Sequence, residues 1–132
     1  MSFDHFAADI TNLPQVLATL RRRAGALGID EAIQSILCIV AEELFLNTVH
    51  HSTDASRVAL ALTRSTEVVT LVYEDTGAAY DPFANVDRSV LHESGDTRRT
   101  GGLGIILVEQ LATTARYENV DQTNRITLTF AT

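Results

Sequence analysis

Two hairpin patterns constrain the fold of this chain more than any other feature. Residues 57–63 (RVALALT) and 68–75 (VVTLVYED) have period-two side chains, and a short polar turn separates them. Residues 115–120 and 125–130 repeat this arrangement near the end of the sequence. Paired runs of this kind are typical of antiparallel β-hairpins. The sequence therefore predicts a mostly antiparallel sheet.

Three stretches with helical spacing accompany the hairpins. Residues 13–24 form the first, a longer helix is expected from the N-cap Asp30 to about Ser52, and residues 102–114 form the third. The order is helix, helix, strand, strand, long loop, helix, strand, strand. We expect a single domain over residues 1–132 of the α+β class. It would be a two-layer α/β sandwich, with helices on one face of a mixed, mostly antiparallel sheet.

The chain contains no lysine. Its ten basic residues are all arginine, and seventeen Asp and Glu residues give a formal net charge of −7. Without lysine the chain cannot form a P-loop or the lysine-bearing strand of eukaryotic-type protein kinases. An acidic chain is also a poor non-specific binder of nucleic acid, because phosphate neutralisation dominates that affinity. The composition therefore excludes two common nucleotide-binding schemes and argues against a nucleic-acid partner.

The sequence shows no recognisable targeting signal. Residues 1–10 are acidic and lack the basic and apolar regions of a signal peptide. No apolar run approaches the roughly 20 residues that span a membrane. Cys38, the only cysteine, lies among apolar neighbours and is expected to be a buried core thiol. The expectation is a soluble cytoplasmic protein with no membrane partner.

The helix over residues 30–52 carries polar groups on its apolar side. Val40 and Leu44 share one face at about 100° per residue, and Asn47 projects within about 40° of the centre of that face. Glu43 lies at the edge of the same face. A carboxylate and an amide in this position are costly unless they find partners. They either pair with other protein groups or face a cleft.

Asp75 ends a very apolar run and opens the long loop. A carboxylate at the end of a strand can accept a hydrogen bond from a ligand at the rim of the sheet. Gly77 permits a close approach or a positive φ. Asp and Gly are also common where a strand simply exits into a turn. This motif alone does not decide between the two explanations.

A glycine-rich segment, residues 100–104 (TGGLG), leads directly into the last expected helix. Glycines there expose backbone N–H groups at a helix N-terminus, which suits an anionic phosphate. Arg98 and Arg99 could add positive charge. The segment lacks the preceding strand and the spacing of a dinucleotide-binding fingerprint. A flexible loop that ends at a helix explains it equally well in isolation.

Together the three segments resemble the histidine-kinase-like ATPase superfamily, also called the GHKL or Bergerat fold. In particular they resemble the small bacterial anti-sigma-factor and switch-protein serine kinases. Residues 43–47 (ELFLN) match the E-x-x-x-N motif of the N box. Residues 75–77 with residues 80–82 match the first glycine box, and residues 100–105 match the second. The resemblance covers essentially the whole chain.

The resemblance implies a role for individual residues. Asn47 would ligate Mg²⁺, which bridges the ATP phosphates. Glu43 would be the general base that activates the attacking hydroxyl. Asp75 would accept a hydrogen bond from the exocyclic amine of adenine, with Gly77 permitting the base to approach. Thr127, rather than Thr129, would help to hold adenine.

The second glycine box would wrap the phosphates, and residues 83–100 would form a mobile lid. The residues expected to bind the nucleotide there are Gly102, Leu103 and Gly104, with Arg98 and Arg99 before them. The first glycine box departs from the family pattern, because Ala79 stands where a second glycine is frequent. This departure puts the affinity for ATP in doubt.

The four histidines do not suggest a transition-metal site. His50 and His51 are adjacent, so on a helix they point about 100° apart. The H-E-x-x-H motif is absent. His51 is expected either to pack near the nucleotide pocket or to satisfy a hydrogen bond in the core, and the second is favoured.

Three functions follow from the resemblance. The first is a regulatory serine/threonine kinase that transfers the γ-phosphate of ATP to a STAS-type antagonist protein in a partner-switching pathway. The second is a non-catalytic, nucleotide-gated module that sequesters a sigma factor or another regulator. The third, a histidine-kinase catalytic domain without its dimerisation helices, is less favoured because the lid is short. Glu43 discriminates the first from the second. Relatives in this family are often homodimers.

Overall fold

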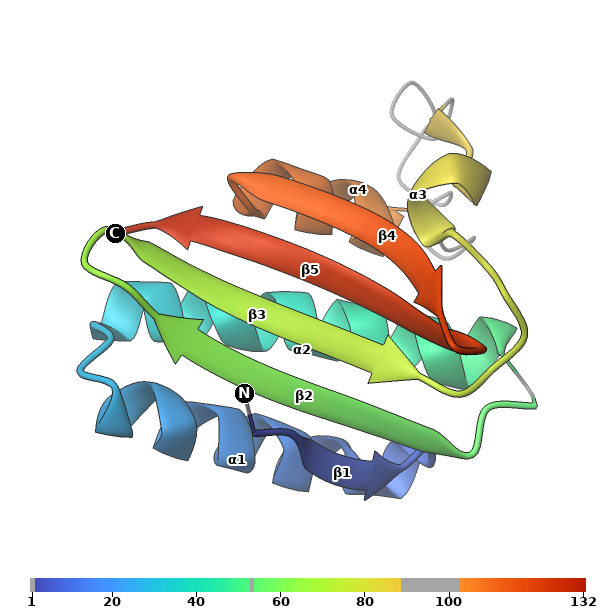
Figure 1. Ribbon diagram of the computed structural model, residues 1–132, viewed down its shortest axis with the longest axis horizontal. Coiled ribbons are helices and arrows are strands. Elements are labelled where there is room, and N and C mark those ends of the chain that lie inside the picture. The colour runs from blue at the N-terminus through green and yellow to red at the C-terminus, as the bar shows by residue number, and fades with distance from the viewer. Residues whose placement is uncertain (1, 53, 89–102) are drawn as a thin grey trace.

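The computed structural model describes residues 2–52, 54–88 and 103–132. Five strands form one sheet in the order β1-β2-β3-β5-β4 (Figure 1). The strands are β1 (Asp4–Ala7), β2 (Arg57–Arg64), β3 (Val68–Asp75), β4 (Thr114–Val120) and β5 (Thr123–Ala131). Every pairing among these described strands is antiparallel, so the sheet is antiparallel rather than mixed.

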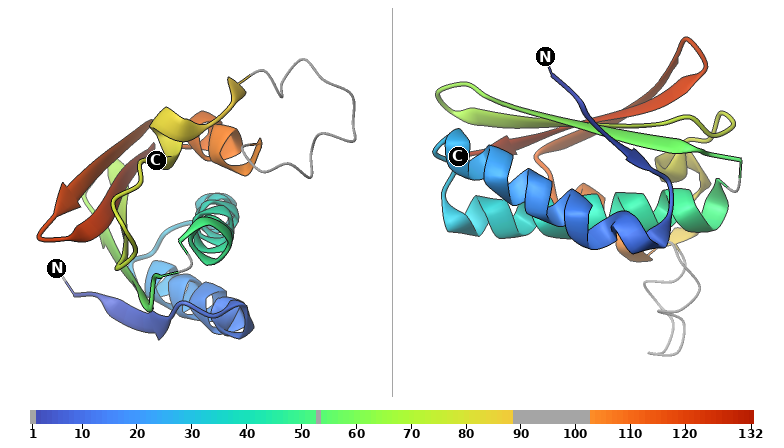
Figure 2. Two further views of the ribbon diagram at one scale, coloured as in Figure 1. Left: turned by 90° about the vertical axis from the view of Figure 1, so that its right-hand side faces the viewer. Right: turned by 90° about the horizontal axis from the view of Figure 1, so that it is seen from below.

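The helices form the second layer of the domain. They are the short 3₁₀ helix η1 (Ile10–Asn12), α1 (Leu13–Ala26), α2 (Glu31–His51), α3 (Pro82–Asn85) and α4 (Leu103–Leu111). The long helices α1, α2 and α4 all lie on one face of the sheet (Figure 2). The predicted α+β two-layer sandwich is therefore confirmed.

The core lies between the sheet and the helices. On β5 every second side chain is buried, which gives the alternation that the sequence predicted. Each large apolar side chain buried in this way contributes about 1.5–3 kcal/mol. Cys38 is also buried, as expected. The largest fully buried side chains include Val16, Leu37, Val40, Leu44, Phe45, Val58, Leu71 and Leu128.

The central helix α2 begins where the sequence predicted. The Asp30 side chain accepts a hydrogen bond from the Ile33 backbone N–H at 2.9 Å, which satisfies one free donor of the first turn. By length and composition alone α2 could cross a membrane, which differs from the sequence-based expectation. Its Val40, Leu44 and Phe45 are fully buried. The core helix of a folded domain passes the same test.

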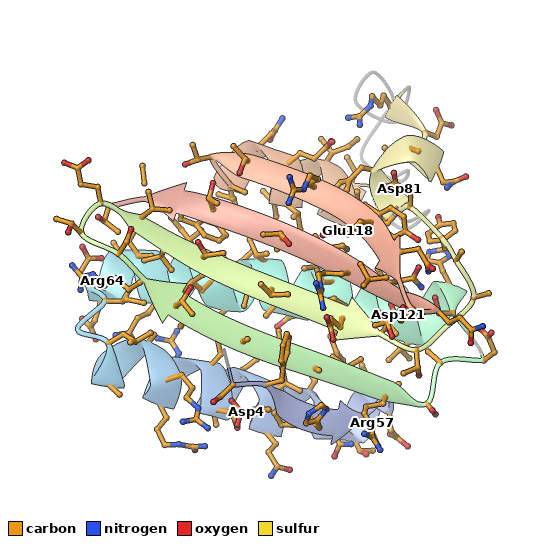
Figure 3. The ribbon with its side chains drawn as sticks, in the orientation of Figure 1. Asp4, Arg57, Arg64, Asp81, Glu118 and Asp121 are labelled. Carbon is orange, nitrogen blue, oxygen red and sulfur yellow. The ribbon has the colours of Figure 1, made fainter. Side chains whose placement is uncertain are left out.

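The connection between α1 and α2 is fixed by a glycine and an arginine. Gly28 has a φ of 70°, a conformation that a residue without a side chain adopts at no steric cost. Arg64, at the end of β2, donates from Nη1 to the carbonyl oxygens of Leu27 (3.0 Å) and Gly28 (2.7 Å), and Figure 3 shows it beside this turn. The sheet is thereby tied to the helix layer at this end.

Two features differ from the sequence prediction. The edge strand β1 was not predicted, and Asp4 at its start forms a bidentate ion pair with Arg23 of α1 at 2.8 and 3.0 Å. The last hairpin turns through two residues, Asp121 and Gln122, which have φ values of 52° and 65°. Two consecutive positive φ angles are those of a type I′ turn, whose twist matches the flanking strands. β5 therefore begins at Thr123 rather than at residue 125.

Candidate functional site

A pocket lies where β3 ends beside the last turns of α2. Its empty volume is about 290 Å³, including the part that is open to solvent. It combines residues of α2, of the segment after β3 and of β5. The lining residues are Leu44, Asn47, Thr48, Ser52, Tyr73, Asp75, Tyr80, Pro82, Asn124 and Ile126. The structure thus brings Asn47 and Asp75, predicted from separate motifs, to one pocket.

Asp75 is a buried carboxylate held by three hydrogen bonds. Its Oδ2 accepts from the Thr48 hydroxyl at 2.9 Å. Its Oδ1 accepts from the Gly77 backbone N–H at 3.0 Å and from the Asn124 amide at 2.9 Å. A carboxylate can accept about four hydrogen bonds. One acceptor position therefore remains for a ligand that enters the pocket.

Asp75 is hydrogen-bonded to a chain of two hydroxyl groups, those of Thr48 and Tyr73. Thr48 gives its single proton to Asp75, so its 2.6 Å contact with Tyr73 uses the proton of the Tyr73 hydroxyl. That hydroxyl also lies 3.1 Å from the Leu44 carbonyl oxygen. Burial raises the pKa of Tyr73 far above its usual value. Tyr73 therefore stays protonated and remains a donor.

Asn124 connects the first glycine box to the last hairpin. Its amide nitrogen donates to Asp75 Oδ1 and to the Ala78 carbonyl oxygen, both at 2.9 Å. Its amide oxygen accepts from the Tyr80 backbone N–H at 3.2 Å and from the Tyr117 hydroxyl. This buried side chain was not predicted from the sequence as a site residue. It fixes both Asp75 and the segment that follows it.

Glu43 lies on α2, one helical turn before Asn47. It is half-buried, and burial raises the pKa of its carboxyl, with a smaller contribution from the neighbouring Glu42 carboxylate. Gly104, in the first turn of α4, lies directly against the Glu43 carboxylate. The N box and the second glycine box therefore meet at this point.

A comparison with known protein families identifies the family of this chain. The sequence matches the model of the histidine kinase-like ATPase domain over residues 6–130. The chain belongs to this ATPase family. Membership implies that the domain binds ATP. No curated protein matches the sequence.

Two solved structures share the fold of this ATPase domain. The crystal structure of the RsbU and RsbW domains of Rv1364c from Mycobacterium tuberculosis is 20% identical, with a TM-score of 0.62, and the match covers 98% of this chain and 32% of that chain. A chain of the SiaB–SiaC complex from Pseudomonas aeruginosa is 14% identical, with a TM-score of 0.57, covering 100% and 90%. The ATPase domain thus spans about a third of the Rv1364c chain. At these identities the likeness is one of fold.

Thr127 does not join the pocket of the ATPase domain. Side chains alternate along β5, and Ile126 and Leu128 on either side of Thr127 are buried against the helices. Thr127, like Thr129, therefore lies on the opposite face of the sheet. The structure contradicts the assignment of Thr127 to the adenine pocket, and Asn124 is the β5 side chain that reaches it.

Gly77 is required by packing. A Cβ atom on Gly77 would lie 2.8 Å from the Ser52 Cβ at the end of α2 and 3.3 Å from the Ala55 Cβ. Positive φ, the other reason considered for a glycine here, does not apply, because Gly28 is the glycine with a positive φ among the described residues. The first glycine box is therefore held close to the end of the N-box helix.

Two further side chains clarify the first glycine box. His51 is exposed and stacks on Tyr80, with ring centroids 6.2 Å apart and an interplanar angle of 14°. The expected core hydrogen bond of His51 is therefore wrong. Asp81, labelled in Figure 3, accepts a hydrogen bond from the Phe83 backbone N–H at 2.9 Å and so caps α3. Its role is local turn structure.

Part of the second glycine box lies outside the described residues. Leu103 and Gly104 form the first turn of α4. Arg98, Arg99 and Gly102, and most of the expected lid over residues 83–100, lie outside the described part of the chain. Their predicted roles stay predictions.

We expect replacement of Asn124 with alanine to weaken both the fold and ATP binding. The change removes the partner of several buried groups around Asp75, at a cost of about 2–4 kcal/mol. Thermal unfolding and titration calorimetry with ATP would measure the two effects. Thr127→Ala, on the same strand, is the matched control and should change ATP affinity less than about twofold. Equal effects of the two variants would contradict the placement of Asn124.

Proposed function

We propose that this chain is an ATP- and Mg²⁺-dependent protein serine/threonine kinase of the anti-sigma-factor type. It transfers the γ-phosphoryl group of ATP to a hydroxyl of a STAS-type antagonist protein. The observation that carries the proposal is the arrangement along α2. Asn47 lines the same pocket as Asp75, and Glu43 lies one turn away in a half-buried position. The groups that would bind the nucleotide and the candidate general base are thus adjacent.

Recognition of the nucleobase of ATP follows from the hydrogen bonds of Asp75. Its remaining acceptor position fits the exocyclic amine of adenine, which is a donor. Guanine has a carbonyl oxygen at the corresponding position, and two acceptors repel each other. The pocket is therefore expected to prefer ATP over GTP.

The residues present also fit a magnesium ion. The Asn47 side chain offers a carbonyl oxygen, a hard ligand that Mg²⁺ accepts together with phosphate oxygens and waters. No described residue forms a hydrogen bond to the Asn47 side chain, so this oxygen is available. When bound, Mg²⁺ would neutralise phosphate charge, which this acidic chain needs. The described part of α4 begins at Leu103. Backbone N–H groups of this first turn would donate to phosphate oxygens in addition to the magnesium ion.

The chemical step assigns the proton to Glu43. The Glu43 carboxylate accepts the proton of the substrate hydroxyl as the hydroxyl oxygen attacks the γ-phosphorus atom. The bond between the γ-phosphorus and the bridging oxygen breaks, and ADP leaves with that electron pair. Burial raises the pKa of Glu43, which makes the carboxylate a stronger base. A module that only bound nucleotide would not need a carboxylate in this environment.

A protein partner is supported by the relatives. The SiaB–SiaC structure is a complex, and its match covers 90% of the similar chain. We extend this to a protein substrate for the present chain, acting in the cytoplasm where ATP is available. The alternative is a nucleotide-gated module that sequesters a sigma factor without phosphorylating any protein.

Titration calorimetry followed by a transfer assay tests this proposal. ATP with Mg²⁺ is expected to bind, and GTP to bind more weakly. With γ-labelled ATP, label should appear on a serine or threonine of a STAS-type protein from the same organism. ATP-dependent capture of a sigma factor without any transfer would favour the alternative function. Absence of ATP binding would reject both.

A further inference from the structure

Gly104 of α4 lies directly against the side chain of Glu43 of α2. Glu43 projects from the middle of α2, and Gly104 lies in the first turn of α4. A Cβ atom built on Gly104 would overlap the Oε2 atom of Glu43 and would lie 2.9 Å from its Cδ. Contacts between a Cβ and another heavy atom are essentially never shorter than 3.0 Å in real structures. Only a residue without a side chain leaves room for the carboxylate in this position.

The clash concerns the end of the Glu43 side chain rather than its root. The same Cβ would lie 3.5 Å from the Glu43 Cγ, which is an ordinary van der Waals distance. The carboxylate belongs to a flexible, half-buried side chain. A side chain added at position 104 would therefore displace the carboxylate without separating the two helices.

Within the part of the chain that the structure describes, no polar partner fixes the Glu43 carboxylate. Among residues 2–52, 54–88 and 103–132, none donates a hydrogen bond to it or forms an ion pair with it. Its position is thus set by the shape of the space around it. Gly104 forms one wall of that space.

We propose that Gly104 is the positioning residue of Glu43: its missing side chain creates the space that holds the carboxylate between α2 and α4. This role is distinct from wrapping the ATP phosphates, which the family resemblance implies for the same glycine. The expected effect on the rate of phosphoryl transfer rests on the proposed kinase function. The placement of the Glu43 carboxylate by Gly104 does not.

The test compares two glycine-to-alanine variants in helices. Gly104→Ala introduces the clash. Gly25→Ala is the matched control, because a Cβ at Gly25 meets nothing within 4 Å. Both changes improve helix propensity, so neither should lower the melting temperature. We expect Gly104→Ala, assayed at saturating ATP, to lose at least about tenfold in single-turnover transfer rate, whatever its measured ATP affinity. Gly25→Ala should match the wild type in both assays.

A shorter acid at position 43 should remove the sensitivity to Gly104. In a Glu43→Asp background the carboxyl carbon takes the place of Cγ, which the added Cβ tolerates. Gly104→Ala should then change the residual transfer rate by less than about twofold. If Gly104→Ala slows transfer equally in both backgrounds, the proposal is overturned.

The placement can also be measured without ATP or a partner. In ¹³C-labelled protein, the Glu43 carboxyl signal should titrate at lower pH in Gly104→Ala than in the wild type, because the displaced carboxylate gains water. Gly25→Ala should titrate as the wild type does. An unchanged titration in Gly104→Ala would overturn the proposal even if kinase activity is found. If the wild-type chain transfers no phosphate, the proposed function fails while this measurement still decides the placement.

Discussion

Replacement of Glu43 with glutamine is expected to abolish phosphoryl transfer while ATP binding is kept. Loss of a positioned general base costs about 10²- to 10⁴-fold in rate. Glutamine has nearly the same shape, so ATP affinity should stay within about threefold. Single-turnover transfer to the partner protein and calorimetry with ATP measure the two quantities. This separation of binding from transfer is what the position of Glu43 outside the pocket lining predicts.

The same variant should be more stable than the wild type at neutral pH. Burial raises the pKa of Glu43, so the folded state keeps its proton to higher pH than the unfolded chain. As the pH rises from the ordinary glutamate value of 4.5 through the folded pKa, the folded state loses stability. Glutamine does not ionise. The melting temperatures of the two proteins should therefore agree near pH 4 and diverge above it.

Glu42→Gln is the matched control for both measurements. It removes one carboxylate from the same turn of α2 and changes the net charge equally. Its carboxylate contributes less than burial to the raised pKa of Glu43, so transfer should fall far less. If Glu42→Gln and Glu43→Gln slow transfer to the same extent, Glu43 acts through charge alone and is not the base.

Most of the fold could be predicted because its elements have strong local patterns. Asp30 predicted the start of α2, and the period-two runs predicted β2 and β3 within a residue of their ends. The edge strand β1 has four residues and no such pattern. Its pairing depends on the free edge of β2 and on the contact between Asp4 and Arg23, which only the folded chain brings together.

The binding site includes a residue that local sequence patterns did not predict. Asp75 and Asn47 could be predicted from motifs, but Asn124 could not, because a four-residue turn over 121–124 places it outside the strand. The two-residue turn instead puts Asn124 opposite Asp75 in the sheet register. The same register turns Thr127 to the other face. A shift of two residues leaves each side chain on its own face, so the shorter turn decides only that β5 extends as far as Asn124.

Replacement of Asp75 with asparagine is expected to reverse the nucleotide preference while the fold is kept. The amide oxygen can still accept from Gly77 and Asn124. The amide nitrogen would then face Thr48. The hydroxyl chain can reverse, since Tyr73 can donate to the Leu44 carbonyl oxygen and Thr48 can donate to Tyr73. The fold should therefore lose no more than about 1 kcal/mol.

The pocket itself changes its hydrogen-bonding character in this variant. The acceptor offered to the adenine amine becomes an N–H donor, and a hydrogen bond to a charged group, worth about 1.5–3 kcal/mol, is lost. ATP affinity should fall about 10- to 100-fold, and GTP should gain relative to ATP. Asp75→Ala is the contrasting variant, because it removes the acceptor of three buried hydrogen bonds and should also unfold at clearly lower temperature. Wild-type ATP affinity in the Asp75→Asn protein would show that the base is recognised elsewhere.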